Sequence, residues 1–191
     1  MITEASCRTL EWYAFRVRPR HEKVVSSALR NKGYVDFLPL SRQRHRWADR
    51  YKTVELPLFP GYIFCETDLH EIGHIKLTPG IVDVVRAGSS PLPARREEIE
   101  DLRCASQHAI SMESCPLIEN VSGHTLRIAS GPLRGFTGVL VEIRGKKRLV
   151  LSVELLRRSV LVELPSDAID PMIFPFTANR HFVEKQMRRS A

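Results

Sequence analysis

The sequence lacks the features that mark several large classes of protein. Its four cysteines form no CxxC pair and no repeated spacing, so neither a zinc site nor a disulfide framework is indicated. No apolar run approaches the roughly 20 residues that span a bilayer, and the first residues do not have the pattern of a secretory signal. We therefore expect a cytoplasmic protein whose thiols are reduced.

The signatures of common enzymes are also missing. Residues 131–138 are rich in glycine, but no Lys-Ser/Thr pair follows them as in a phosphate-binding loop, and the GxGxxG and GxSxG motifs are absent. His70 and His74 stand one helical turn apart without an evident third ligand for a metal ion. We expect no enzymatic activity, no cofactor and no metal site.

Apolar and basic residues, by contrast, are plentiful. Of the 191 residues 43% are hydrophobic, which is enough for the cores of one medium and one small domain. The formal net charge is +7, and residues 16–52 alone carry eleven Lys or Arg against three acidic residues. This excess favours an anionic partner such as nucleic acid, although a solvated charged face would have the same composition.

Residue periodicity predicts an α+β domain over residues 1–110. Strands are expected over 12–17, 35–40, 54–58, 62–66 and 81–86, helices over 20–31, 69–77 and 97–109, and a basic hairpin tip or loop over 42–52. The first two helices should bury Val24, Val25, Ala28 and Leu29, and Leu69, Ile72 and Ile75, respectively. Gly33 should end the first helix, and Asp68 with Glu71 resembles a capping box. This order fits a ferredoxin-like sandwich with its helices on one face.

The rest of the chain predicts a linker, a small β domain and a tail. Residues 111–121 lack periodicity and are expected to be the linker. Short β segments over 125–128, 138–143, 148–153 and 158–164 predict a small barrel within residues 122–170. Residues 171–191 are expected to form a basic C-terminal tail.

A short aromatic motif interrupts the apolar stretch near residue 60. Its sequence is Phe59-Pro60-Gly61-Tyr62, in which proline fixes φ and lacks an amide donor while glycine allows a tight bend. One interpretation is a buried β-bulge that shapes the core. The other is a turn that presents an aromatic ring to a partner.

Several motifs together resemble the NusG family. Its N-terminal (NGN) domain has motifs of the same order and spacing as Trp12-Tyr13, the helix over 20–29, and residues 59–64 and 78–82. Its KOW motif resembles residues 123–128 and 130–139. The resemblance covers residues 12–169 and implies an NGN sandwich followed by a small SH3-like all-β KOW barrel. Residues 46–50, 57–62 and 149–160 resemble the UpxY and LoaP pattern. This resemblance places the chain with the specialised UpxY, LoaP and RfaH type and implies antitermination on long operons.

The resemblance implies a binding surface for RNA polymerase. In NusG-like proteins the first domain grips the clamp helices of the largest polymerase subunit, and Phe59, Pro60 and Tyr62 match that surface. Tyr13 and Phe15 are expected to support it, one or both of them from the core. Aromatic anchors in such a groove would supply most of the binding energy.

Two further contacts are implied. Arg18, Arg20, His21 and Lys23 lie where relatives touch the non-template DNA strand, so they could neutralise phosphates and stack on unpaired bases. Phe136 matches a NusG residue that docks a small-subunit ribosomal protein or Rho, although a place in the barrel core would equally explain it.

We therefore expect a monomeric elongation and antitermination factor that binds RNA polymerase, suppresses pausing or termination, and recruits the ribosome or another factor through its KOW domain. The main alternative is an RNA-binding or ribosome-associated protein that uses the KOW barrel, since Arg144 and Lys146 to Arg148 form a basic turn. An enzyme with an unrecognised site is a remoter alternative.

Overall fold

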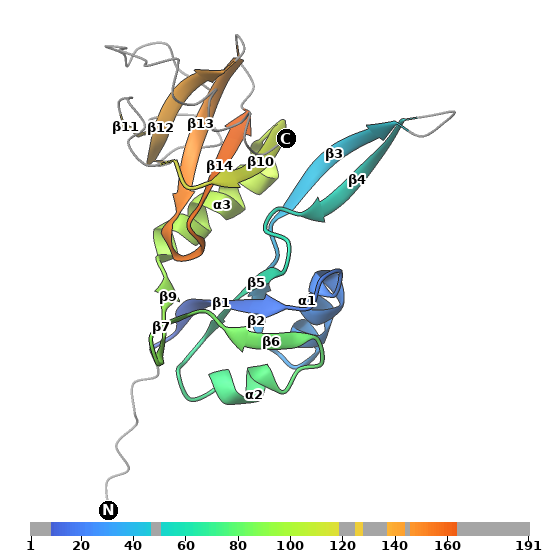
Figure 1. The fold of residues 1–191 in the computed structure, drawn as a ribbon, viewed down its shortest axis with the longest axis vertical. Helices are drawn as coiled ribbons and strands as arrows, with labels where there is room; N and C mark the ends of the chain where they lie inside the picture. Colours follow the sequence, from blue (N-terminus) through green and yellow to red (C-terminus); the bar gives the residue numbers. More distant parts are fainter. Residues whose placement is uncertain (1–8, 47–50, 119–124, 128–136, 144–145, 164–191) are drawn as a thin grey trace, which may run out of the picture. The chain divides into compact units, whose positions relative to one another are not determined.

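The chain forms two compact units. The computed structural model in Figure 1 describes residues 9–46, 51–118, 125–127, 137–143 and 146–163. Residues 1–38 and 60–96 make up unit 1, and residues 39–59 and 97–191 make up unit 2. Within the described ranges, no helix is both long enough and apolar enough to cross a membrane.

Unit 1 has the ferredoxin-like fold that the sequence predicts. Its main elements are β1 (Glu11–Val17), α1 (Glu22–Asn31), β2 (Val35–Phe37), β5 (Tyr62–Thr67), α2 (Ile72–Lys76) and β6 (Ile81–Val84). The sheet has the order β2-β5-β1-β6, and its pairs are antiparallel. This order and the strand-helix-strand repeat define the ferredoxin-like arrangement. The short strand β9 (Pro93–Ala94) also pairs with β1, while β7 (Arg86–Ala87) pairs with β8 (Ser90–Pro91).

Both helices of unit 1 cover the same face of the sheet. Alternate residues of a strand point to opposite faces, and in β1 the set that meets the helices consists of Tyr13, Phe15 and Val17. They pack in one buried cluster with Val25 and Leu29 of α1 and with Ile72 and Ile75 of α2. The predicted placement of the helices on one face is confirmed.

Two residues expected in the helical cores are exposed instead. Val24 is 63% exposed because the buried face of α1 runs through Val25, Ser26 and Leu29. Leu69 is 57% exposed because it lies in the turn before α2, which begins only at Ile72. Ile72 and Ile75 are buried as predicted.

Unit 2 contains a hairpin, a helix and a second sheet. The hairpin consists of β3 (Leu40–Arg46) and β4 (Tyr51–Pro57), so the basic stretch predicted as a hairpin tip or loop lies largely in paired strands. The helix is α3 (Arg96–His108), whose buried residues Ile99, Leu102 and Ala105 are those predicted. The sheet has the order β10-β14-β13-β12-β11.

The five strands of this sheet include the four that the sequence predicts. They are β10 (Ser111–Pro116), β11 (Thr125–Arg127), β12 (Thr137–Ile143), β13 (Lys146–Val153) and β14 (Arg158–Glu163), and the 3-10 turn η1 (Glu154–Leu156) connects the last two. All pairs are antiparallel. The described residues of the segment 122–170 therefore lie mostly in β strands, as expected.

Residues 111–116, the first part of the predicted linker, form the strand β10. Met112 is buried opposite Val162 of β14, and Ser41 Oγ donates a hydrogen bond of 2.7 Å to its carbonyl oxygen. Ser111–Pro116 has no alternation of its own, so pairing with β14 makes it a strand. The domain boundaries expected at residues 110 and 122 remain a prediction.

Candidate polymerase and nucleic-acid interface

The turn at Pro60 and Gly61 is held on both sides by hydrogen bonds. Gly61 has φ of 82°, a conformation that favours glycine. Its carbonyl oxygen accepts from the Val17 amide at the end of β1, and its own amide donates to Glu22 Oε1 at the start of α1, both at 2.8 Å. The turn is thereby joined to the adjoining strand and helix of unit 1.

Of the two aromatic rings in the motif, the structure exposes Tyr62. Tyr62 opens β5 opposite Arg16 of β1, so both lie on the sheet face opposite to the one packed against α1 and α2. Tyr62 is half-buried, Arg16 and Pro60 are exposed, and Phe59 is only 3% exposed. Tyr62 and Pro60 are therefore available to a partner, whereas Phe59 is buried.

The two predicted supporting residues lie in the core. Tyr13 and Phe15 are buried on the helix-covered face, opposite Cys65 and Ile63 of β5. The Tyr13 hydroxyl donates a hydrogen bond of 2.8 Å to Glu11 Oε2, and burial together with this bond raises the pKa of Tyr13 to about 12. Neither ring can touch a partner in the folded protein, so any role they have is to support the sheet.

The predicted nucleic-acid residues form an exposed basic loop. Arg18, Arg20 and His21 lie between β1 and α1, and Lys23 lies in the first turn of α1. All four are exposed, and we call them the basic loop. Arg20 has φ of 65°, and His21 Nδ1 lies 3.0 Å from the Pro19 carbonyl oxygen. The loop follows directly from the strand end that binds Gly61, so it is joined to the same structural unit as Tyr62.

A second Pro-Gly turn, in the segment 78–82 that resembles the NGN domain, holds the other side of the loop. The Arg18 amide donates to the Gly80 carbonyl oxygen at 2.8 Å. Gly80 has φ of 98°, and a Cβ added there would lie 2.8 Å from Val25 Cγ2. Pro79-Gly80 repeats the dipeptide Pro60-Gly61. That repetition was the available signal that the two turns belong to one site.

Glu22 is a second residue that sequence reasoning missed. It is the first residue of α1 and is only 4% exposed although it carries a carboxylate. An acidic residue in the first turn of a helix is common because it favours the helix dipole. The sequence therefore contained no signal that this side chain reaches residue 61.

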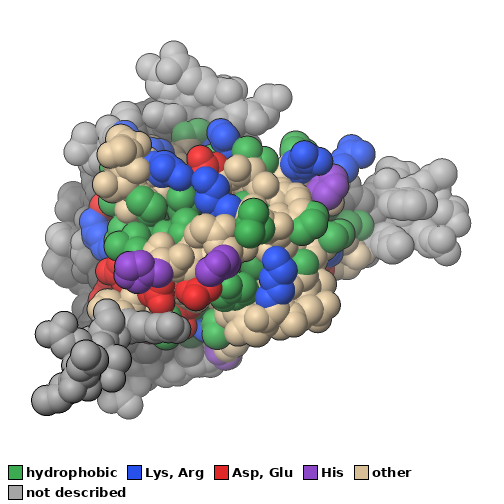
Figure 2. All heavy atoms as spheres, turned by 90° about the horizontal axis from the view of Figure 1, so that it is seen from below, with side chains coloured by type: hydrophobic (Ala, Val, Ile, Leu, Met, Phe, Trp, Pro, Cys, Tyr) green, Lys and Arg blue, Asp and Glu red, His purple; other side chains and the backbone are tan. Residues whose placement is uncertain are grey.

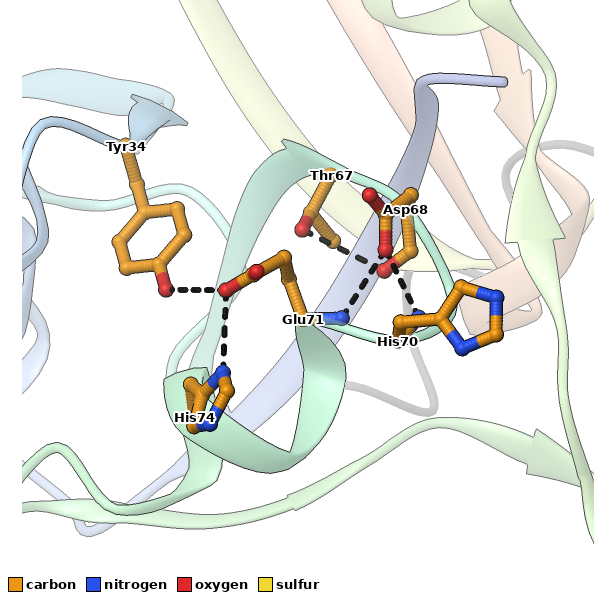
Figure 3. A network of polar contacts seen from close by, with 6 residues as sticks. All are labelled: Tyr34, Thr67, Asp68, His70, Glu71 and His74. Carbon is orange, nitrogen blue, oxygen red and sulfur yellow. Dashed lines mark hydrogen bonds and ion pairs between the residues drawn. The ribbon is translucent and has the colours of Figure 1, made fainter. Parts of the chain in front are cut away.

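The two histidines flagged as possible metal ligands belong to a polar network around α2 (Figure 3). Asp68 Oδ1 accepts from the amides of His70 and Glu71 at 2.8 and 3.0 Å, in the turn before α2. The predicted capping box does not cap the helix, because the N-cap of α2 is Glu71 and makes no side-chain capping bond. Glu71 Oε2 accepts from the Tyr34 hydroxyl at 2.9 Å and lies 3.2 Å from His74 Nδ1. The hydrogen bond from Tyr34 and, to a lesser extent, the contact with His74 lower the pKa of Glu71 below its usual range.

Metal-ligand geometry does not emerge in the part of the chain that the structure describes. No group of three or more His, Cys, Asp or Glu there could hold a metal ion.

The face drawn in Figure 2 carries hydrophobic, basic and acidic side chains interspersed, with histidines beside acidic side chains. It does not have the uniform charge of a nucleic-acid groove.

The predicted contacts of the second domain are only partly visible. Phe136 and Arg144 lie outside the described residues. Arg148, from the basic turn proposed to contact RNA, is 3.3 Å from Glu113 and 3.6 Å from Glu163. Its charge is compensated within unit 2.

A family model described as "Transcription termination factor nusG" matches residues 10–103, which contain both Pro-Gly turns and the basic loop. The chain belongs to the NusG family. Its NusG relatives include the transcription termination/antitermination proteins of Thermus thermophilus and Borreliella burgdorferi. The first is 26% identical over 76% of this chain and 90% of its own, and the second 24% identical over 83% and 97%.

A solved structure of NusG from Thermotoga maritima covers 81% of this chain and 93% of its own, with a TM-score of 0.45 and 19% identity. By name the NusG relatives are factors of transcription termination and antitermination. This NusG-family protein is accordingly a transcription factor.

Proposed function

We propose that this NusG-family protein binds RNA polymerase through the part of the unit 1 sheet face that carries Tyr62 and Arg16, and suppresses pausing or termination. The observation that carries the proposal is the Pro60-Gly61 turn, which is held at both ends and places Tyr62 beside Arg16 on that face. An aromatic ring on a rigid turn loses little conformational freedom on binding, which suits it as an anchor. The expected partner is the clamp-helix region of the largest polymerase subunit.

Tyr62→Ala tests the proposal because it removes a half-buried ring without emptying the core. We expect retention on purified elongation complexes to fall at least about tenfold, as is usual for an aromatic anchor. Leu69→Ala, which removes an exposed apolar side chain before α2, is the matched control and should bind as the parent does. Phe59→Ala is a poor test, since Phe59 is buried and its loss would destabilise the fold. Unchanged retention of Tyr62→Ala would refute the proposal.

The basic loop is proposed to contact the exposed non-template DNA strand. Its four side chains are exposed and extend from the strand end that holds the Tyr62 turn. Replacing Arg18 and Arg20 by alanine should reduce crosslinking to that strand and lower the salt dependence of binding by about one unit of slope per arginine. Arg86→Ala, an exposed arginine that pairs with Asp83, is the charge-matched control.

The finer parts of the function rest on the family resemblance. We propose antitermination on particular long operons, as in the UpxY, LoaP and RfaH type, and recruitment of a small-subunit ribosomal protein or Rho through Phe136. Transcript profiling after deletion of the gene would test the first part, because distal portions of the target operons should be lost. Capture of each purified candidate by the parent and by Phe136→Ala would test the second.

A further inference from the structure

Glu22 combines burial, charge and a main-chain contact distant in sequence. Its side chain is 4% exposed, and Oε1 accepts the Gly61 amide at 2.8 Å. A buried carboxylate is costly unless hydrogen bonds compensate it. The α1 N-terminus and the Gly61 amide supply that compensation.

Gly61 needs this acceptor because of its place in the chain. Its carbonyl oxygen is bound to the Val17 amide, and its φ of 82° turns the peptide out of the extended conformation just before β5 begins at Tyr62. This amide is partly buried, so losing its acceptor would destabilise the turn. The length of the Glu22 side chain therefore sets the position of the turn relative to α1.

The same hydrogen bond joins the two surfaces of the proposed function. Tyr62 follows Gly61 directly, and the basic loop ends at the helix that Glu22 begins. Arg18 is held independently, through its amide, by the Gly80 carbonyl oxygen. Movement of the 60–61 turn away from α1 would change the relative position of Tyr62 and the basic loop.

We infer that Glu22 is a positioning residue that fixes the polymerase-contacting turn against the DNA-contacting loop, so that both contacts are made together. The inference rests on the proposed function. Glu22 touches neither partner because it is buried, and it acts through the position of its Oε1 atom and not through its charge.

Two substitutions separate position from charge. Glu22→Gln removes the charge but keeps an oxygen at the same distance along the side chain, so retention on purified elongation complexes should stay within about twofold of the parent. Glu22→Asp keeps the charge but withdraws the acceptor by one methylene, so retention and non-template crosslinking should each fall about tenfold, the effect of losing a buried hydrogen bond. The opposite order would overturn the inference.

A purely structural role is tested with Asp36→Ala. Asp36 is a buried carboxylate of β2 whose Oδ2 accepts from Ser26 Oγ at 2.5 Å and whose Oδ1 accepts from Arg30 Nε at 2.6 Å, away from both turns. The Asp36→Ala variant should lose at least as much thermal stability as Glu22→Asp. At temperatures below its unfolding midpoint it should still be retained on elongation complexes. Equal loss of retention at equal stability would reduce Glu22 to a stabilising residue.

A double-mutant cycle with Tyr62→Ala completes the test. If Glu22 acts through the turn, Glu22→Asp should change retention less than about twofold once the Tyr62 ring is gone. Additive losses would overturn the inference. Full retention of Tyr62→Ala alone would refute the polymerase proposal, whereas a loss with Tyr62→Ala and none with Glu22→Asp would refute only the role of Glu22.

Discussion

Two turns of unit 1 share the dipeptide Pro-Gly but make different demands on it. At Gly61 the nearest atom to an added Cβ would be the Val17 carbonyl oxygen at 3.7 Å, an ordinary contact. At Gly80 an added Cβ would lie 2.8 Å from Val25 Cγ2, a side chain that is fully buried. Glycine is needed at the first turn for its φ alone and at the second for both φ and space.

The difference shows that one sequence signature can serve two purposes. The second turn is packed closely against Val25 of α1. The first is held mainly by hydrogen bonds to Val17 and Glu22, and it leads into a residue that is still partly accessible. A turn held by directional bonds can place a surface residue without burying it.

The largest effect is expected from Gly80→Ala. The added methyl group would collide with Val25 and would also be strained at φ of 98°, which together should destabilise the protein by about 3 kcal/mol or more. Urea unfolding followed by near-ultraviolet circular dichroism would measure it. Gly88→Ala is the control, because its φ is 62° and an added Cβ would meet no non-neighbouring atom within 4 Å. Adding Val25→Ala should relieve part of the Gly80→Ala defect, and strictly additive losses would contradict the steric account.

Gly61→Ala should have a smaller effect. Only the positive φ is unfavourable there, so a loss of about 1.5 kcal/mol in unfolding free energy is expected. The same urea titration applies, and Val25→Ala should give no relief in this case. A loss as large as that of Gly80→Ala would show that the two turns do not differ as described.

Thr78→Val probes what holds the second turn from outside. The Thr78 hydroxyl accepts a hydrogen bond of 2.8 Å from Lys32 Nζ, and its loss should destabilise the protein by about 1 kcal/mol in thermal unfolding. Lys32→Met removes the same bond from the other side. The double variant should therefore be no less stable than the less stable of the two single variants. If the two losses in stability added in full, that would argue against the bond.

Tyr34→Phe should have the smallest effect and should depend on pH. The Tyr34 hydroxyl and His74 lower the pKa of Glu71 below its ordinary value of 4.5, so ionised Glu71 stabilises the folded state. That stabilisation is present above pH 4.5 and is lost as the pH falls through the lower pKa of the folded protein. Tyr34→Phe should lower the melting temperature slightly at pH 7 and not at pH 2. An equal difference at both values would exclude Glu71 as the cause.

Helices and strands with a strong periodicity of apolar residues could be predicted from the sequence. Strands that exist only because they pair with another strand could not. The alternation in Glu11–Val17 and the helical stripe of Arg96–His108 are local patterns, and both elements lie within a residue or two of the expected place. Ser111–Pro116 has no such pattern, and its pairing with β14 makes it a strand. The short strands β8 and β9 were likewise invisible in the sequence.

The sequence named candidate residues for the site but did not predict how they are arranged. The motif at residues 59–62 identified the turn, and the basic loop was placed correctly at the start of α1. Which aromatic ring faces outward depends on the register of β5 against β1, where Tyr62 pairs with Arg16. Register is a property of two strands and cannot be read from one.

The sequence by itself determined the order of the elements in unit 1, the four later strands, the basic excess and the resemblance to the NusG family. Each of these depends on residues close together in the chain or on motifs at fixed spacing. The tertiary structure alone decided that Phe59 is buried, that Tyr62 is accessible, and that Glu22 holds Gly61. Glu22 and Gly61 are 39 residues apart, and a contact over that distance exists only once β1, α1 and β5 have packed together.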